Sequence, residues 1–524
     1  MLSITVHSLN RNTNALQSII AIFLQASKTP VRVVNTLARM GISISTTSID
    51  RMVGSLSSKS ANKLRDLGQT LLVCYAYDNF DVDLKTHLPT IDKPTDTLKH
   101  LTSALCFPLE HGITLEDMRC SDLLWEKSRL NPYANPSNIP PSVTMEQLLN
   151  IHPEPDPEQF GGLNRRDRFN SWKFLFDLVH YGPAPFHPLQ AKIGKPDIIE
   201  QIPITKTPIT PTRAMNCSNS SVSGNIETIL NLMQQGGLGD PNDMDTKFEV
   251  VDVNPFVILF HGDLGTGDRI LSILQRRAIE KTPWNRLQYA IFVPGLFHVK
   301  MACADAVWRA FLKPLSSRLD TTSLMQDVSK LRSNETGIIG SNPGFCRMHQ
   351  VIGHSGICRR LDCWKIEVNR QKNMTLDQFA ASEPSLKELK GIADYLALNY
   401  VSNTQLVRER RKSVDLRDQQ LENGLLLNRC CLLYEELTYA MNTGDIGRVE
   451  TCLVSWIVVF KAVRKHKYAF HITRFLSEVH FLYPAGLKKA VRYHILVNPS
   501  GKEGKYRAVD WCVELDNLLT KVRS

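Results

Sequence analysis

A chain of 524 residues is too long for one ordinary hydrophobic core, and 43% hydrophobic with 22% charged residues is typical of ordered globular protein. The N-terminus lacks the basic-then-apolar pattern of a secretory signal, the twelve cysteines are scattered, and no apolar stretch reaches the roughly 20 residues that a bilayer requires. These features exclude the secreted and membrane-spanning classes and predict an intracellular protein in a reducing compartment.

The net charge of +10 is concentrated at the two ends of the chain. Residues 1–70 carry eight Lys and Arg against two acids, and residues 461–524 carry thirteen against five, so the middle is mildly acidic. Basic ends favour a polyanion such as DNA as a partner, because phosphate neutralisation releases counterions. Solvated basic faces explain the same pattern.

Residues 1–69 are predicted to be helical, with helices from Ala15 to Gln25, from Pro30 to Met40 and from about Ser48. Apolar positions on both sides of the turn at Gly41 can close a small core. Two helices joined by a short Gly-containing turn, with arginines nearby, resemble a helix-turn-helix, although any αα-hairpin has the same pattern.

A first part of an α/β core is predicted for residues 70–130, where the apolar run Leu71 to Tyr77 indicates a buried strand that ends in Asp78. Residues 131–211 hold 14 of the 27 prolines and are interpreted as a connecting region, interrupted by a helix around 172–180. A second part of the core is predicted for residues 212–345.

Three strands and one helix are expected in that second part. The strands are predicted at 248–251, 256–260 and 287–293, and the helix at about 297–312. Residues 346–524 are predicted to be helix-rich, with a C-terminal helix that returns to the core. Helices are expected at 386–400, 405–441 and 445–463, the last with Asp445 as its N-cap.

Two local motifs are candidate ligand-binding sites. The glycines between His261 and Asp268 fit neither nucleotide-binding fingerprint, so we interpret the segment as a strand end presenting Asp263, with Asp268 starting the next helix. Cys346-x2-His349-x4-His354-x3-Cys358 supplies four zinc-type ligands at a spacing that matches no standard site, and a small core with satisfied histidines explains it as well.

Three acids at the ends of predicted elements form the main candidate site: Asp78, Asp263 and Glu514. Clustered carboxylates repel one another unless a divalent cation neutralises them, and two Mg²⁺ or Mn²⁺ ions in such a cluster support phosphodiester cleavage. Asp510 is the alternative third acid. Aspartates also serve as helix caps and turn formers, which is the competing interpretation.

Several segments resemble a large fungal family of uncharacterised domains, and the resemblance spans essentially the whole chain. The matching segments are 77–80, 100–104, 221–226, 261–263, 295–301, 444–448, 496–501 and 509–514.

That family is in turn reminiscent of transposase-derived proteins. The resemblance implies a mixed α/β fold with a ribonuclease H-like sheet core, a large helical insertion and helix-rich N- and C-terminal parts. It also implies that Asp78, Asp263 and Glu514 are catalytic and bind Mg²⁺ or Mn²⁺, with His298 as an accessory histidine beyond the second acid.

The sequence therefore predicts a transposon-derived protein that acts as a metal-dependent DNA nuclease of transposase type. The alternative is a catalytically inactive descendant that binds nucleic acid or a protein partner. The basic stretch at 408–412 is a candidate nuclear-import segment, and a solvated helix face explains it equally. The sequence lacks the heptad regularity that would indicate a coiled-coil dimer.

Overall fold

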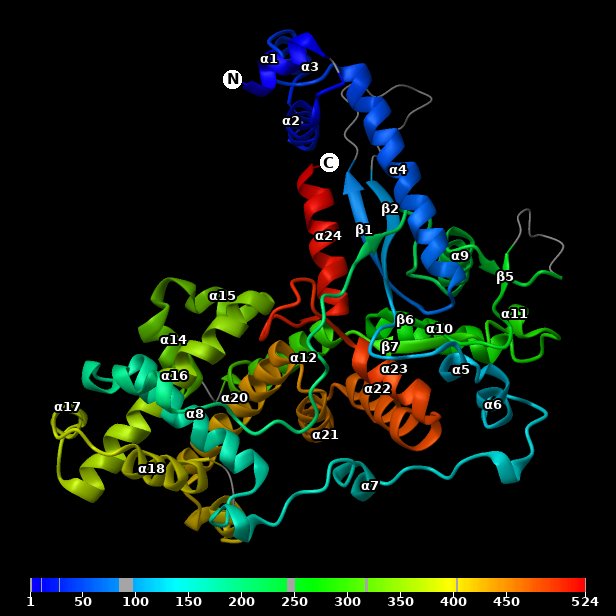
Figure 1. The fold of residues 1–524 in the computed structure, drawn as a ribbon. Helices are drawn as coiled ribbons and strands as arrows, with labels where there is room; N and C mark the ends of the chain where they lie inside the picture. Colours follow the sequence, from blue (N-terminus) through cyan, green and yellow to red (C-terminus); the bar gives the residue numbers. More distant parts are fainter. Residues whose placement is uncertain are drawn as a thin grey trace.

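The computed structural model describes residues 2–10, 12–27, 29–83, 98–242, 250–315, 319–401 and 404–523, with the side chains of the last helix described as far as residue 518. A mixed α/β core, with the N-terminal helices at one end, is joined to a large helical lobe (Figure 1). Among the described residues, no helix combines the length and the apolar character needed to cross a membrane.

The N-terminal segment folds into four helices: α1 (Leu2–Leu9), α2 (Ala15–Ala26), α3 (Val31–Arg39) and α4 (Thr46–Gln69). Ser45 caps α4 by accepting a hydrogen bond from the backbone of Ser48. Ala21, Val34 and Ile49 are buried together in a small separate core. The predicted helices and the small core are confirmed, whereas the helix-turn-helix interpretation stays a prediction.

A five-stranded mixed sheet lies at the centre of the core. Its strands, in spatial order, are β3 (Thr210–Pro211), β2 (Leu98–Pro108), β1 (Val73–Asp83), β6 (Ile258–Gly262) and β7 (Ala290–Pro294). β2 is antiparallel to both β1 and β3, while β1, β6 and β7 are parallel. Two small sheets pair β4 (Leu238–Gly239) with β5 (Val251–Asp252) and β8 (Leu496–Val497) with β9 (Arg507–Ala508).

Strand β1 is longer than the sequence predicts. It continues through Asp78 to Asp83, because β2 supplies hydrogen-bonding partners along its whole length, with Asp78 opposite Ser103. Asp78 is therefore inside a strand and not beyond its end. β6 and β7 confirm the strands predicted at 256–260 and 287–293. Of the strand predicted at 248–251, Phe248 and Glu249 lie outside the described residues and Val251 is the first residue of β5.

The two faces of the sheet carry different helices. The Tyr77 hydroxyl donates to Asn225 on α9 (Val222–Gln235), which packs with α4 and with α10 (Leu264–Arg276). Side chains alternate along a strand, so Asp78 points to the opposite face, on which α24 (Val509–Arg523) packs against β1 and β2. α24 thus returns the C-terminal part of the chain to the sheet.

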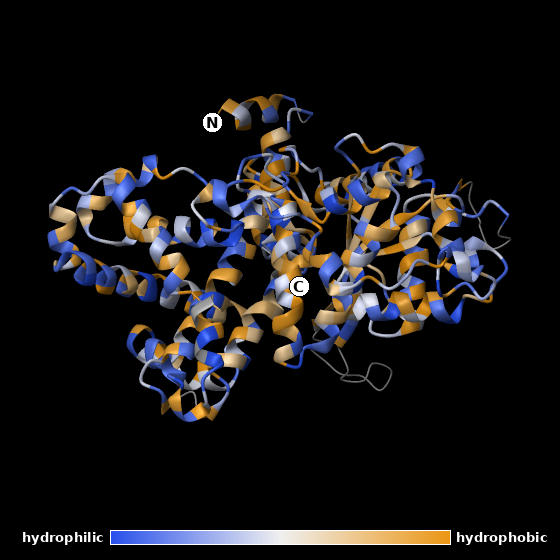
Figure 2. Ribbon diagram, turned by 90° about the horizontal axis from the view of Figure 1, so that it is seen from below, coloured by the Kyte–Doolittle hydropathy of each residue, from blue (hydrophilic) through white to orange (hydrophobic). Residues whose placement is uncertain are grey.

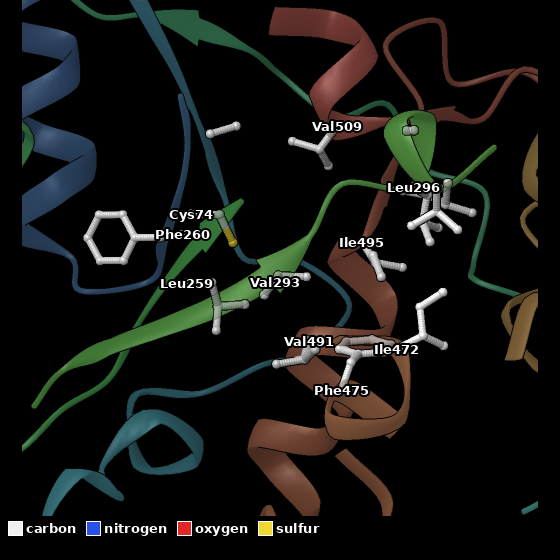
Figure 3. Close-up of a cluster of buried hydrophobic side chains, with 14 of the residues drawn as sticks. Cys74, Leu259, Phe260, Val293, Leu296, Ile472, Phe475, Val491, Ile495 and Val509 are labelled. Atoms are coloured by element: carbon white, nitrogen blue, oxygen red, sulfur yellow. The ribbon is translucent and has the colours of Figure 1, made fainter. Parts of the chain in front are cut away.

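The apolar contacts beneath α24 join distant parts of the chain into one core (Figure 3). Cys74, Leu259 and Val293 from three neighbouring strands lie in the same cluster as Val491 of α23 (Ala485–His494) and Phe475 of α22 (His466–Ser477). A π-helical turn, Glu478–Leu482, follows α22 directly.

The proline-rich region contains more regular structure than its composition predicts. Within residues 131–211, α7 (Met145–Leu149) precedes a long helix, α8 (Arg165–Tyr181), which contains the helix predicted around 172–180. The short helices α5 (Leu115–Met118) and α6 (Ser121–Glu126) lie before this region in the chain. Phe174 and Leu178 of α8 are fully buried in the second core cluster. This region therefore supplies a buried helix as well as connections.

Helices dominate the remainder of the chain: α11 (Pro283–Arg286), α12 (Leu296–Phe311), α14 (Leu324–Leu331), α15 (Thr336–Ser341), α16 (Gly344–Lys372), α17 (Leu376–Ala381), α18 (Leu386–Asn399), α19 (Thr404–Arg410), α20 (Gln419–Thr443) and α21 (Ile446–Ala462). Short 3-10 turns lie at Pro136–Asn138, Pro157–Phe160, Ala184–Lys192, Ser333–Glu335 and Val414–Leu416.

In the lobe, many helices carry apolar and polar residues side by side, as expected when one face of each packs inward (Figure 2). The helix predicted at 405–441 is divided by the turn at Val414–Leu416, after which Asp418 caps α20. Asp445 caps α21, as predicted.

Candidate metal centre

The register of the parallel strands brings the first two predicted acids to one level of the sheet. Ala76 on β1 lies opposite His261 on β6, and Asp78 and Asp263 each follow two residues later. β7 ends at Pro294, opposite Gly262, and leads through Gly295 into α12. The carboxyl ends of β6 and β7 and the middle of β1 therefore meet at one site.

Helix α24 is fixed over this site by hydrogen bonds at two of its residues, Asn517 and Asp510. Ser103 on β2 hydrogen-bonds to Asn517, and Asp510 accepts hydrogen bonds from the backbone N–H groups of Phe297 (3.0 Å) and His298 (2.9 Å). Asp510 thus satisfies N–H groups in the first turn of α12, which have no partner within that helix. It also accepts from His298 Nδ1 at 2.9 Å.

Asp78, His298 and Glu514 form the cluster at the centre of the site. Their nearest ligand atoms, one from each side chain, all lie within 4.8 Å of one another. His298 Nε2 lies 3.6 Å from Glu514 Oε1. The three groups come from β1, α12 and α24, so the sheet and two helices position them.

Asp263 lies close to this group but has a different hydrogen-bonding role. Its side chain caps α10 by accepting from the backbone N–H of Thr266 at 2.6 Å. Its charge still raises the pKa of both Asp78 and His298. The predicted start of this helix at Asp268 is wrong, because the Asp263 cap places the first turn at Leu264; Asp268 instead pairs with His471 on α22 at 2.6 Å.

The electrostatics of the site indicate an excess of negative charge. Burial, together with the charges of Glu514 and Asp263, raises the pKa of Asp78 to about 7, although the Asn79 backbone N–H opposes the shift. Burial alone would lower the pKa of His298, but the hydrogen bond and charge of Asp510 and the nearby aspartates raise it to about 9. Without another cation, an imidazolium is therefore the counterion of the site.

The donor set fits a divalent cation. Asp78 and Glu514 offer carboxylate oxygens and His298 offers Nε2, because its Nδ1 is engaged by Asp510. A carboxylate bound to the second nitrogen of a metal-ligating imidazole is a common way to fix the orientation of the ring. Mn²⁺ accepts such a mixed set, and Mg²⁺ requires mainly the oxygens.

The zinc interpretation of the Cys346 to Cys358 motif is wrong for the described residues. All four side chains lie on the single helix α16, where their spacing distributes them around the axis. Cys346 and Cys358 are exposed, and His349 Nδ1 is hydrogen-bonded to the Tyr434 hydroxyl at 2.8 Å. The four groups do not gather into one ligand set.

Two functional features were not anticipated. Asp510 was predicted only as a rival to Glu514, whereas the structure gives the two acids different contacts. Gly295 lies so close to Asp510 that a Cβ there would be 2.3 Å from Asp510 Oδ2. A glycine directly before a predicted helix was the available signal.

The fold and the site define a mixed α/β protein with a carboxylate and histidine cluster on the face of a five-stranded sheet. The chain belongs to DUF6589, a family of unknown function whose model matches residues 144–523. The match includes Asp263, His298 and Glu514, while β1 with Asp78 precedes it. No curated protein and no solved structure matches the chain.

Proposed function

We propose that this protein is a metal-dependent DNA nuclease of transposase type with a ribonuclease H-like core. The observation that carries the proposal is the convergence of Asp78, His298 and Glu514 from remote segments, with Asp263 at the same level of the sheet. The sheet order, an antiparallel meander extended by two parallel strands, is compatible with such a core and supports the proposal.

In this proposal Asp78 and Glu514 hold the cation between the sheet and α24, and Asp263 contributes a third negative charge. Mg²⁺ or Mn²⁺ bound there would activate the attacking water and stabilise the leaving oxygen of a phosphodiester. Asp510 keeps the imidazole of His298 in one orientation, so that Nε2 faces Glu514. Asp510 is therefore a positioning residue.

The basic N-terminal helices are the proposed DNA-binding part. Arg32, Arg39 and Arg51 are exposed on α3 and α4, and α4 packs onto α9 and the sheet at its other end. Helix α4 thus connects the basic segment to the core. An intracellular and nuclear location follows from this proposal and remains a prediction.

The proposal is tested by measuring nicking of supercoiled DNA in Mg²⁺ and in Mn²⁺. Asp263→Asn, Asp78→Asn and Glu514→Gln should each reduce cleavage at least 100-fold, by the order of magnitude expected for loss of a catalytic group. Asn is as good an N-cap as Asp, so the Asp263 variant should fold normally. Asp81→Asn is the matched control, because Asp81 is on β1 but faces away and pairs with His100.

Nicking that survives all three substitutions contradicts the proposal. DNA binding that weakens steeply with salt, without any cleavage or divalent-cation dependence, instead favours the catalytically inactive nucleic-acid-binding protein.

A further inference from the structure

A second cluster of ligand-type side chains lies remote from Asp78 in the chain. His152 follows α7, Glu450 is on α21, and His480 is on the π-helical turn after α22. His152 Nε2 lies 2.6 Å from Glu450 Oε2, and His480 Nε2 lies 3.1 Å from Glu450 Oε1. Their ligand atoms all lie within 4.8 Å of one another.

These separations suit one small ion. Two ligands about 2.0 to 2.1 Å from a tetrahedral zinc ion are about 3.3 Å apart, so only small side-chain movements would be needed. Glu450 is fully buried, and the side chains of His152 and His480 are 13% and 6% exposed. The cluster is thus preformed by three segments that the fold holds in place.

His480 carries an independent indication of a ligand. Although its Nε2 is near Glu450, it lacks a partner with hydrogen-bond geometry among the described residues. The residue is presented by a π-helical turn, a rare element that is frequent at functional sites. This buried nitrogen lies 3.1 Å from Glu450 Oε1, so one ion could contact both groups.

The charge balance also favours a cation. Arg492 pairs with both Glu450 and Glu200, at 2.7 Å and 2.5 Å. One guanidinium carries one positive charge against two carboxylates, so a second positive charge at the cluster, on a metal ion or on an imidazolium, would be stabilised.

We propose that His152, Glu450 and His480 form a binding site for Zn²⁺. Two imidazoles and one carboxylate select zinc or a similar transition ion over Mg²⁺ or Ca²⁺, which prefer all-oxygen sets. Arg492 donates a hydrogen bond to the Glu450 carboxylate and is itself held by Glu200. A fourth ligand can enter from a cavity of about 730 Å³ that His152 and Glu450 line.

This inference does not depend on the proposed nuclease activity. The test uses full-length Asp78→Asn/Glu514→Gln protein, in which the first cluster is disabled. After exposure to Zn²⁺ and dialysis, we expect about one zinc per chain by atomic absorption. When His152→Gln and His480→Gln are introduced into the same protein, the bound zinc should be lost. His354→Gln is the control, because His354 is exposed on α16, and it should leave the zinc content unchanged.

A second measurement covers the case in which the doubly substituted cluster fails to fold. Co²⁺ added to the Asp78→Asn/Glu514→Gln protein should give the visible absorption of a tetrahedral nitrogen and oxygen site, and Zn²⁺ should displace it. Loss of that absorption in the single variant His152→Gln supports the site. A protein that retains no zinc, or that keeps it after both histidines are replaced in folded protein, overturns the inference.

Discussion

Asp510 holds His298 at two points, because its carboxylate accepts hydrogen bonds at 2.9 Å from both the backbone N–H and the ring Nδ1 of that histidine. One helical turn further along α24, Glu514 approaches the other ring nitrogen. Asp510 is 5% exposed and Glu514 is 42% exposed. The same helix therefore supplies a buried acid that orients the imidazole and an accessible acid that faces the cluster.

Gly295→Ala should disturb the site without changing any of its charged groups. The added Cβ would lie 2.3 to 2.8 Å from three atoms of Asp510, so α24 or the start of α12 must move. We expect a loss of about 1–3 kcal/mol in the free energy of unfolding and a loss of divalent-cation binding at the Asp78 site.

The matched control is Gly353→Ala on α16, where a Cβ meets no atom within 4 Å. That change should be neutral or stabilising by up to about 1 kcal/mol, because Ala has the higher helix propensity. Urea unfolding and calorimetric Mn²⁺ titration measure both effects. Equal behaviour of the two variants would show that Gly295 is not a close-approach position.

The raised pKa of His298 predicts a loss of stability at alkaline pH. A group whose pKa rises from about 6.5 unfolded to about 9 folded stabilises the protein fully below pH 6.5, and this contribution is lost as the pH rises to 9. Urea unfolding in EDTA measures the free energy of unfolding of wild type and of His298→Gln. The excess stability of wild type over the variant should decrease by on the order of 2 kcal/mol between pH 6.5 and pH 9. A difference that is independent of pH contradicts the Asp510–His298 pairing.

Asp78→Asn should stabilise the metal-free protein at pH 8. The pKa of Asp78 is raised to about 7, so between pH 4 and 7 the folded state keeps a proton that the unfolded state loses, and stability falls as the pH rises. The Asp78→Asn substitution removes this charge, so it should increase the free energy of unfolding by about 2–4 kcal/mol at pH 8 and change it little at pH 4.

Divalent cations should make wild type more stable than Asp78→Asn, the reverse of the order expected without metal. Mn²⁺ should raise the Tm of wild type and of the Asp81→Asn control, but not that of Asp78→Asn, which has lost a ligand. A variant that is less stable than wild type in EDTA at pH 8 would mean that Asp78 is not held among other negative charges.

The elements with strong apolar patterns could be predicted from the sequence. Strands β6 and β7, the Asp445 cap and the small N-terminal core followed from apolar runs and capping residues. The sequence predicted that Asp78 and Asp263 lie at strand ends that could be neighbours, but it did not give the order of the strands in the sheet. The polar start of β2 at Leu98–His100 gave no strand pattern, so neither the length of β1 nor the position of Asp78 within it could be foreseen.

The details of the sites depend on tertiary contacts that no local pattern encodes. The role of Asp510 arises when α24 meets the first turn of α12. In the cluster of His152, Glu450 and His480, His152 is about 300 residues away from the other two along the chain, and the π-helical turn has no sequence signature. By contrast, the four ligand-type residues from Cys346 to Cys358 are close in the sequence and suggested zinc as one interpretation, but a continuous helix separates their side chains.

Arg448 should be among the most sensitive positions in the helical lobe. Its side chain is fully buried and pairs with Glu436 at 2.8 Å and with Asp445 at 3.3 Å. Arg448→Met leaves these carboxylates buried with less compensation, so urea unfolding should show a loss of about 3–5 kcal/mol. Lys195→Met is the control, because Lys195 and Glu503 are both about two-thirds exposed, and it should cost less than about 1 kcal/mol. If the two variants unfold at the same urea concentration, the buried network contributes no more to stability than a surface ion pair does.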